Sequence, residues 1–220
     1  MNLGVVIVSA GIGTRLGKRD KPILKLGSKP LFSHSLEVFK SLKQVKQIVL
    51  VLRKSHFRLA RKFIQDGRVI LVEGGARRRD SVYNGLLALD GGIDSVLVHD
   101  GARPLISREL VIKVIKALKI NPAVILGVKA TDTLKLTKGK IIKKTVKRDD
   151  FYCAQTPQGF RKDLIVEAYK KFKSKAITDS AQAVELLGKR VKIVEGDRYN
   201  IKITYPQDIA LAEAIYRLKR

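Results

Sequence analysis

The chain has 220 residues, of which 45 are Lys or Arg and 20 are Asp or Glu, so its formal net charge is +25. With 45% hydrophobic and 30% charged residues, its composition is that of a globular protein with a hydrophobic core, and it excludes a disordered chain. A single cysteine, Cys153, excludes a disulfide framework and a multi-cysteine metal cluster. We expect Cys153 to be a small buried side chain.

Short runs of Val, Ile and Leu alternate with stretches that have apolar residues at helical spacing. Strands are expected at about residues 4–9, 47–52, 68–72, 95–98, 122–127 and 190–195. Helices are expected at about residues 31–43, 56–65, 80–89, 107–119, 161–173, 179–187 and 206–219, with Asp80 and Ser107 as N-caps. The alternation predicts an α/β fold, Rossmann-like, with an open, mostly parallel sheet and helices on both faces.

Residues 131–150 interrupt this alternation. Two β-like stretches flank Lys138-Gly139, which predicts a β-hairpin arm inserted into a single domain of residues 1–220. A two-stranded ribbon is only marginally stable alone, and this one carries too many charges to bury much surface. We therefore expect the arm to pack against a second copy of the chain in a homodimer.

The N-terminal sequence reads as a buried strand rather than a signal peptide, and no apolar run approaches the ~18 residues of a membrane span. A cytoplasmic protein without a membrane partner is therefore expected. The positive charge attracts anions, but it is spread along the whole chain and there is no Trp, which does not favour specific nucleic-acid binding.

The first strand runs into a glycine-rich loop, residues 9–17, at the strand end where α/β sheets bind nucleotides. The loop lacks the Gly-Lys-Ser/Thr of an ATPase P-loop and the third glycine of a dinucleotide-binding loop. It offers Gly11 and Gly13 for close backbone approach to phosphates, and Arg15 and Lys21 for their charge. These features predict triphosphate binding and nucleotidyl transfer with pyrophosphate as leaving group.

Two further strand ends carry polar groups: residues 99–104 (HDGARP) and 74–81 (GGARRRDS). Asp100 can hold sugar hydroxyls or Mg²⁺, and Arg103 a phosphate. The second segment can offer backbone groups to a base, and Ser81 a hydroxyl. The first segment is alternatively a structural turn, and Asp80 in the second is alternatively no more than an N-cap. The three histidines have no metal-ligand spacing.

Several motifs together resemble the 2-C-methyl-D-erythritol 4-phosphate cytidylyltransferases of isoprenoid biosynthesis. They occur in the family's order between Val5 and Glu213: SAGIGTRLG with the following Lys21, EGGARRRDSV, VHDGARP, DTLK, TVKR, AQTPQGF, TDSAQAVE and NIKITYPQDIALAE. Ribitol-5-phosphate cytidylyltransferases are similar and remain the alternative within this class. A basic RNA-binding protein is the alternative from a different class.

The resemblance implies a role for each matching residue. Arg15, Lys21, Arg148 and Lys202 would be catalytic. The nucleotide, CTP, would be held by Ser9, Ala10, Gly11, Gly13, Gly75, Ser81 and Asp100. The polyol phosphate would be held by Arg103, Thr133, Thr156 and Thr178, with Thr133 and Arg148 reaching from the arm into the neighbouring subunit's site. Mg²⁺ would be the cofactor, bound through the phosphates and Asp100.

The chain departs from the family's usual pattern at several positions. Ser9 stands where Ala is usual, and Gly101 where Ala or Ser is common, which we expect to be a minor change. The loop between Arg15 and Lys21 is one residue shorter. Ala76 replaces a frequent Asp in the base-recognition loop, which would relax selectivity for cytosine.

Overall fold

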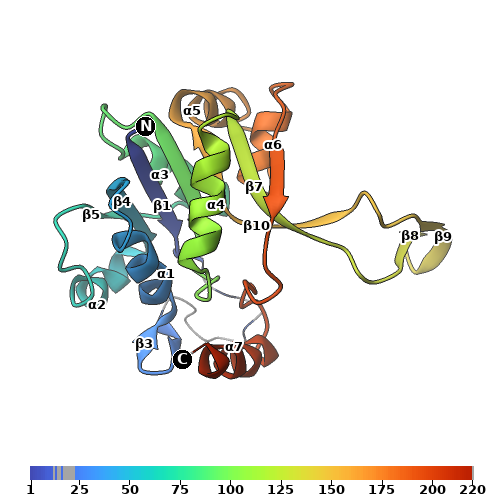
Figure 1. Cartoon of the computed structure of the whole chain (residues 1–220), viewed down its shortest axis with the longest axis horizontal. Coiled ribbons are helices and arrows are strands. Elements are labelled where there is room, and N and C mark those ends of the chain that lie inside the picture. Colours follow the sequence, from blue (N-terminus) through green and yellow to red (C-terminus); the bar gives the residue numbers. More distant parts are fainter. Residues whose placement is uncertain (12, 14–15, 17–22, 220) are drawn as a thin grey trace.

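A mostly parallel sheet forms the centre of the protein (Figure 1). The computed structural model describes residues 1–11, 13, 16 and 23–219. Among these, seven strands pair in the order β11-β7-β10-β6-β1-β4-β5, and only β10 runs antiparallel to its neighbours. Two further pairs, β2–β3 and β8–β9, form separate two-stranded sheets. In chain order the strands are β1 (Leu3–Val8), β2 (Lys25–Leu26), β3 (Lys29–Pro30), β4 (Val45–Leu52), β5 (Val69–Glu73), β6 (Ser95–Asp100), β7 (Ala123–Lys129), β8 (Leu134–Lys138), β9 (Ile141–Val146), β10 (Tyr152–Arg161) and β11 (Lys192–Glu195).

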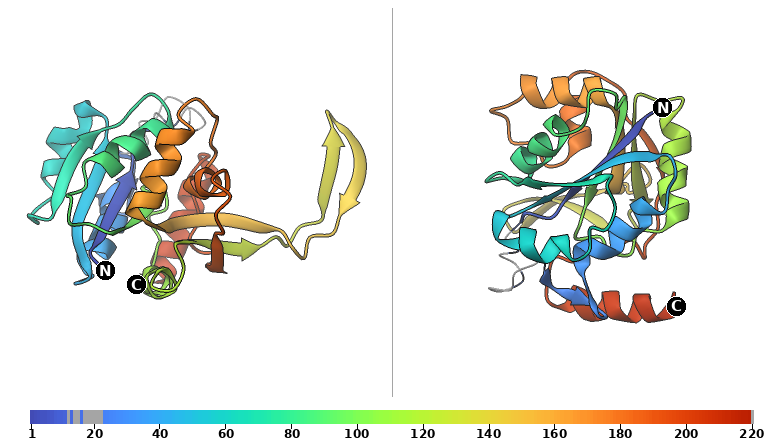
Figure 2. Two further views of the ribbon diagram at one scale, coloured as in Figure 1. Left: turned by 90° about the horizontal axis from the view of Figure 1, so that it is seen from above. Right: turned by 90° about the vertical axis from the view of Figure 1, so that its left-hand side faces the viewer.

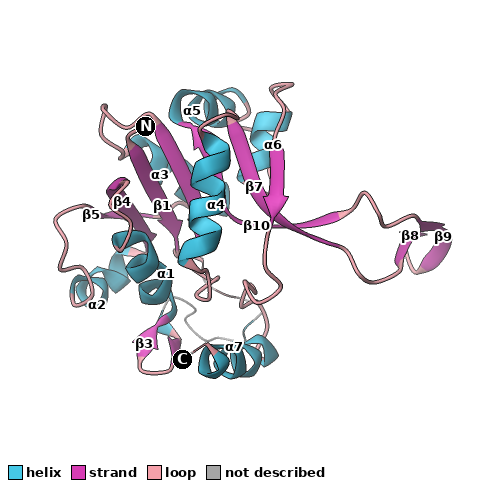
Figure 3. Cartoon of the chain, in the orientation of Figure 1, coloured by secondary structure: helices cyan, strands magenta, loops and turns pink. Residues whose placement is uncertain are grey.

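Helices cover both faces of this sheet (Figure 3). They are α1 (Leu31–Lys40), α2 (Phe57–Arg61), α3 (Arg78–Leu87), α4 (Arg108–Leu118), α5 (Lys162–Lys171), α6 (Ser180–Glu185) and α7 (Gln207–Leu218). Phe39 of α1 and Val114 of α4 are fully buried against one face, and Leu86 of α3 and Ile165 of α5 against the other. The predicted Rossmann-like α/β fold is confirmed.

A third, smaller core lies at the carboxyl edge of the sheet. There α7 packs with the β2–β3 hairpin, and Leu16, Leu26 and Ile203 are buried together between them. This packing brings the C-terminal part of the chain next to the ends of the central strands, where the sequence predicts the site.

The β-arm lies where the sequence predicts it. Strands β8 and β9 pair as an antiparallel ribbon that projects from the body, as the yellow strands in Figure 2 show. Leu136, Ile141 and Ile142 are exposed on this ribbon. The arm therefore leaves apolar side chains uncovered by the chain itself.

Three local predictions have different outcomes. Ser107 is the N-cap of α4, since its Oγ accepts a hydrogen bond from the Leu110 amide at 3.3 Å. The prediction for Asp80 is wrong by three positions: Arg77 is the N-cap of α3, and Asp80 lies in the first turn and accepts from the Arg77 amide at 3.2 Å. Cys153 is exposed, not buried, because β10 leaves the body there toward the arm.

No helix in the part of the chain that the structure describes is long and apolar enough to cross a membrane.

Candidate active site

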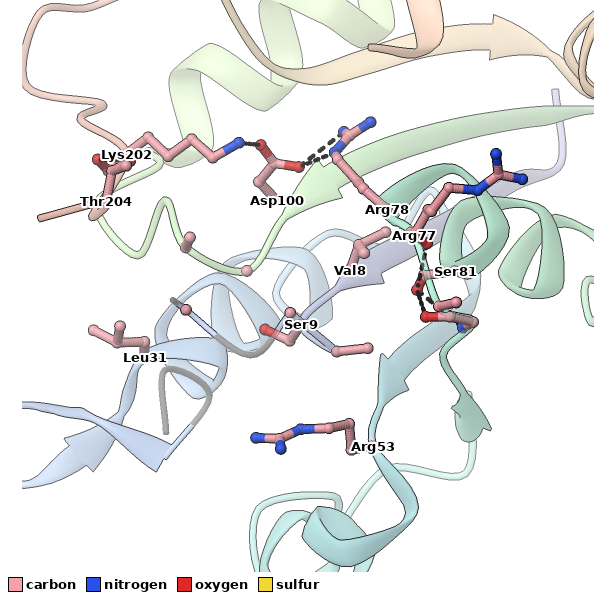
Figure 4. Close-up of a pocket in the computed structure, with 17 residues that line it drawn as sticks. Val8, Ser9, Leu31, Arg53, Arg77, Arg78, Ser81, Asp100, Lys202 and Thr204 are labelled. Atoms are coloured by element: carbon pink, nitrogen blue, oxygen red, sulfur yellow. Dashed lines mark hydrogen bonds and ion pairs between the residues drawn. The ribbon is translucent and has the colours of Figure 1, made fainter. Parts of the chain in front are cut away.

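A pocket of about 470 Å³ opens at the carboxyl edge of the sheet, where the loops after β1, β5 and β6 meet the segment before α7 (Figure 4). Its lining consists of Val8, Ser9, Ala10, Gly11, Gly13, Leu31, Arg53, Gly75, Ala76, Arg77, Arg78, Ser81, Asp100, Gly101, Ala102, Lys202 and Thr204. Short loops and cations therefore surround the pocket at the strand ends. This edge of the sheet is where open α/β folds usually bind their ligands.

Two glycines let the loops approach the end of β1 closely. A Cβ on Gly74 would overlap the side chain of Ala10, and a Cβ on Gly101 would overlap the Oγ of Ser9. The loop after β1 is consequently in direct contact with the loops after β5 and β6. Any larger residue at either glycine must move a wall of the pocket.

Asp100 is the acidic residue among the described lining residues, and it lies between two cations. Nη2 of Arg78 is 2.8 Å from its Oδ1, and Nζ of Lys202 is 2.6 Å from its Oδ2. Burial alone would raise the pKa of Asp100, but the charges of Arg78 and Lys202 hold that pKa far below its usual range. The carboxylate is therefore ionised and fully paired.

A chain of buried hydrogen bonds fixes Asp100 from behind. The Asp100 amide donates to Oγ1 of Thr156 at 3.0 Å, and this hydroxyl lies 3.1 Å from Nδ1 of His99. Nε2 of His99 lies 3.1 Å from the carbonyl oxygen of Arg103, which can only accept, so Nε2 carries the proton and Nδ1 accepts from Thr156. Burial lowers the pKa of His99 to about 4, which keeps the ring neutral at pH 7.

Backbone contacts hold the segment that carries Lys202. Arg103 donates from its guanidinium to the carbonyl oxygen of Asn200 at 2.6 Å, and the Ile203 amide donates to the carbonyl oxygen of Ala102 at 2.9 Å. The segment is thus attached to the loop after β6 on both sides of Lys202. Its side chain reaches Asp100 from a fixed backbone.

Ser81 shapes the loop between β5 and α3. Its Oγ accepts from the Gly75 amide at 3.1 Å and lies 3.3 Å from the carbonyl oxygen of Arg77. Both groups are in the loop that faces the pocket. The hydroxyl therefore holds the loop in shape as well as lining the cavity.

The structure brings together eight of the residues that the resemblance implies for the site: Ser9, Ala10, Gly11, Gly13, Gly75, Ser81, Asp100 and Lys202. Arg103 and Thr156 are buried directly behind Asp100 and do not line the pocket. Thr133, Arg148 and Thr178 are exposed and also lie outside its lining, and the arm carries the first two. Arg15 and Lys21 lie outside the described residues.

Arg78 is the main site residue that sequence reasoning missed. It follows the glycine-rich loop after β5 and is the first residue of α3, yet the three consecutive arginines from Arg77 onward look alike in sequence. Only the contact with Asp100, 22 positions further along the chain, sets it apart.

The pocket's donor set suits a divalent cation only together with a phosphate ligand. Among the described residues no group of three or more His, Cys, Asp or Glu side chains could hold a metal ion. Of the lining residues that the structure describes, Asp100 alone carries a carboxylate. Mg²⁺ commonly binds one or two carboxylates together with substrate phosphates, so Asp100 fits a metal of that kind.

Comparisons with known proteins identify the family to which the chain belongs. The family model for 2-C-methyl-D-erythritol 4-phosphate cytidylyltransferase (IspD) matches residues 3–218. The protein of that name from Alkaliphilus oremlandii is 39% identical, with 98% of this chain and 95% of that protein covered. The one from Geobacillus kaustophilus is 40% identical, with 98% and 97% covered.

Comparison with solved structures indicates the same family. The 4-diphosphocytidyl-2C-methyl-D-erythritol synthase of Anaerococcus prevotii superposes with a TM-score of 0.89 at 36% identity, over 99% of this chain and 96% of that one. The 2-C-methyl-D-erythritol 4-phosphate cytidylyltransferase of Thermus thermophilus superposes with a TM-score of 0.82 at 34% identity, over 99% and 100%. The chain belongs to the 2-C-methyl-D-erythritol 4-phosphate cytidylyltransferase family.

Proposed function

We propose that the protein joins CTP to 2-C-methyl-D-erythritol 4-phosphate, giving 4-diphosphocytidyl-2-C-methylerythritol and pyrophosphate, a step of isoprenoid biosynthesis. The observation that carries this proposal is the pocket at the carboxyl edge, in which close-packed glycine loops face Arg78 and Lys202. Family membership supplies the identity of the two substrates.

CTP would lie along the pocket with its base and its phosphates at different loops. We place the base at the loop that Gly75 and Ser81 form, and the triphosphate at residues 9–13, where backbone amides can face phosphate oxygens. Asp100 would hold the ribose hydroxyls or the metal. Ala76 carries no polar side chain that selects a base, so we expect some use of UTP.

The chemistry needs charge compensation rather than a general base. The second pKa of a phosphate monoester is near ~6, so the acceptor is mostly a dianion at neutral pH. One of its oxygens forms a bond to the α-phosphorus of CTP, while the bond from that phosphorus to the bridging oxygen breaks and pyrophosphate leaves. Lys202, with Arg15, Lys21 and Arg148, would offset the negative charge that gathers in this transition state. Bound Mg²⁺ would supply further positive charge at the phosphates.

We further propose that the protein is one domain, and that two copies pair through the arm to complete each other's sites. The exposed apolar side chains of Leu136, Ile141 and Ile142 support an interface there. Thr133 and Arg148 lie on the arm and not at the pocket of their own chain. Both would contact the acceptor in the partner's pocket.

Pyrophosphate release tests the activity. The protein is incubated with CTP and Mg²⁺, and with either 2-C-methyl-D-erythritol 4-phosphate or ribitol 5-phosphate, while UTP and ATP replace CTP in parallel reactions. We expect release with methylerythritol phosphate and CTP, and weaker release with UTP. Release with ribitol phosphate alone would move the assignment to that class, and release with neither acceptor would refute it.

A further inference from the structure

The pocket contains a carboxylate, Asp100, that lies between two of the cations in its lining, Arg78 and Lys202. Oδ1 of Asp100 accepts from Nε of Arg78 at 2.9 Å and lies 2.8 Å from Nη2, while its Oδ2 accepts from Nζ of Lys202 at 2.6 Å. The three residues come from the start of α3, the end of β6 and the segment before α7. Arg78 and Lys202, two of the cations that line the pocket, are thus already paired with this carboxylate.

We infer that Asp100 acts as an internal counter-anion, which competes with the phosphates of the ligand for Lys202 and Arg78. In this proposal Lys202 leaves Asp100 for the phosphates only when a divalent cation binds together with those phosphates. The inference rests on the proposed function, because it takes the ligand to be a metal-bound triphosphate. It makes Asp100 a selector for the metal complex over the bare anion.

The reason lies in the burial of the carboxylate. Only 9% of the Asp100 side chain is exposed, so water screens its charge poorly. If a metal-free phosphate formed an ion pair with Lys202, the Asp100 carboxylate would lose that cation and would lie beside the negative phosphate. A divalent cation between carboxylate and phosphate removes that repulsion, and so offsets the loss of the Lys202 contact.

Lys202 is the partner that can move. Its side chain is 38% exposed, and it holds Asp100 through one ammonium group at the end of a flexible stem. Arg78 is 28% exposed and holds one carboxylate oxygen through two nitrogens, from the first turn of a helix. Arg78 is accordingly a positioning residue that keeps Asp100 in place while Lys202 exchanges partners.

The backbone of Asp100 is fixed at the edge of the pocket. It is the last residue of β6, and its amide is bonded to Thr156 inside the protein. Because its two oxygens are paired with Arg78 and Lys202, the carboxylate lies between these cations, and a ligand has to compete with it.

The decisive experiment measures binding with and without metal. Isothermal titration calorimetry follows pyrophosphate, and separately CTP, added to the full-length protein and to its Asp100→Asn variant, once in EDTA and once with Mg²⁺. We expect the variant to bind metal-free pyrophosphate about 10-fold more tightly than the original protein, because both cations lose their competing anion. With Mg²⁺ we expect no gain or a loss.

Asp66→Asn is the matched control. It makes the same change in net charge, but Asp66 precedes β5 at the opposite edge of the sheet and pairs with Arg68. Its metal-free binding should be unchanged. If Asp100→Asn weakens binding equally with and without Mg²⁺, Asp100 is a simple ligand and the inference is wrong; it is also wrong if Asp66→Asn tightens binding as much.

A second variant keeps the test independent of how well Asp100→Asn folds. Lys202→Gln releases one carboxylate oxygen of Asp100, so Mn²⁺ alone should bind several-fold more tightly, as electron paramagnetic resonance of free Mn²⁺ can measure. Unchanged Mn²⁺ affinity would overturn the inference. Neither measurement involves the acceptor, so the inference can hold even where the assay of cytidylyl transfer fails.

Discussion

Nζ of Lys202 lies 2.6 Å from Oδ2 of Asp100, although 102 positions separate the two residues. This ion pair joins the segment before α7 to the end of β6, and both residues line the pocket (Figure 4). It places a cation beside the predicted phosphate position, on a backbone that neighbouring hydrogen bonds hold.

Lys202→Gln should lower kcat by ~10²-fold, as expected when one transition-state charge contact is lost. The fold should persist, because Arg78 still pairs with Asp100. Steady-state kinetics and circular dichroism measure the two effects. Lys219→Gln, which removes a cation that pairs with Asp197 near the other end of α7, is the control and should leave kcat unchanged. A near-normal kcat in Lys202→Gln would refute the role.

Mixing two inactive variants tests whether the arm acts in the partner's site. If Arg148 acts in trans, then Arg148→Ala and Lys202→Gln chains form mixed dimers that each have one intact site. Random pairing should restore about a quarter of the original activity. Mixing Arg148→Ala with the chain that carries both changes is the control and should restore none. Absence of recovery in the first mixture, with dimers present by light scattering, would contradict action in trans.

The strands buried on both faces of the sheet were predictable, and the strand with polar side chains was not. β1 is a continuous apolar run, so its residues alone identify it. β10 contains Gln155 and Gln158 in place of a continuous apolar run, and no strand was expected there. Their side chains bond to the Asp197 carbonyl and to the Asp179 carboxylate, and partners so distant in the chain leave no local pattern.

The site residues, like the strands, were predictable only where the local sequence pattern identifies them. Gly11 and Gly75 follow apolar strands and Asp100 ends one, so their meeting at one edge was predictable. The neighbouring arginines were not separable in sequence. Arg78 pairs with Asp100, whereas Arg79 is buried and donates to three carbonyl groups at the end of α5 and just beyond it. Only the packing of α3 against α5 separates those two environments.

Stability should fall between pH 6.5 and 4 because of His99. Burial lowers the pKa of His99 from 6.5 to about 4 in the folded protein, so in this window the unfolded chain binds a proton that the folded one does not. The free energy of unfolding should therefore decrease as pH falls through it, by about 3 kcal/mol in total. Urea unfolding at a series of pH values measures this loss.

The His99→Gln variant isolates the effect of that ring. Glutamine offers one acceptor and one donor group but does not titrate, so its unfolding free energy should vary less with pH over the same window. Burial also lowers the pKa of His34, which acts in the same direction in both proteins and cancels in the comparison. Parallel curves for the two proteins would show that His99 does not carry the dependence.

Ser9 and Gly101 form one structural unit, although in sequence they are two separate departures from the family's usual residues. A Cβ at position 101 would occupy the place of the Ser9 Oγ, so the serine hydroxyl fills the space that a side chain at 101 would need. Gly101→Ala alone should turn the Ser9 hydroxyl into the pocket and raise KM for CTP several-fold. Overpacking of this kind costs about 1–3 kcal/mol.

The double variant Ser9→Ala/Gly101→Ala should recover most of the loss, because an alanine at position 9 lacks the overlapping oxygen and leaves only a tight Cβ contact of 3.1 Å. Ser9→Ala by itself should change KM little. A double-mutant cycle on KM for CTP and on thermal unfolding measures the coupling between the two positions. Additive effects would mean that the hydroxyl and the missing side chain do not share one space. Coupling of the expected sign would show that the serine hydroxyl at position 9 is tolerated here because residue 101 is glycine.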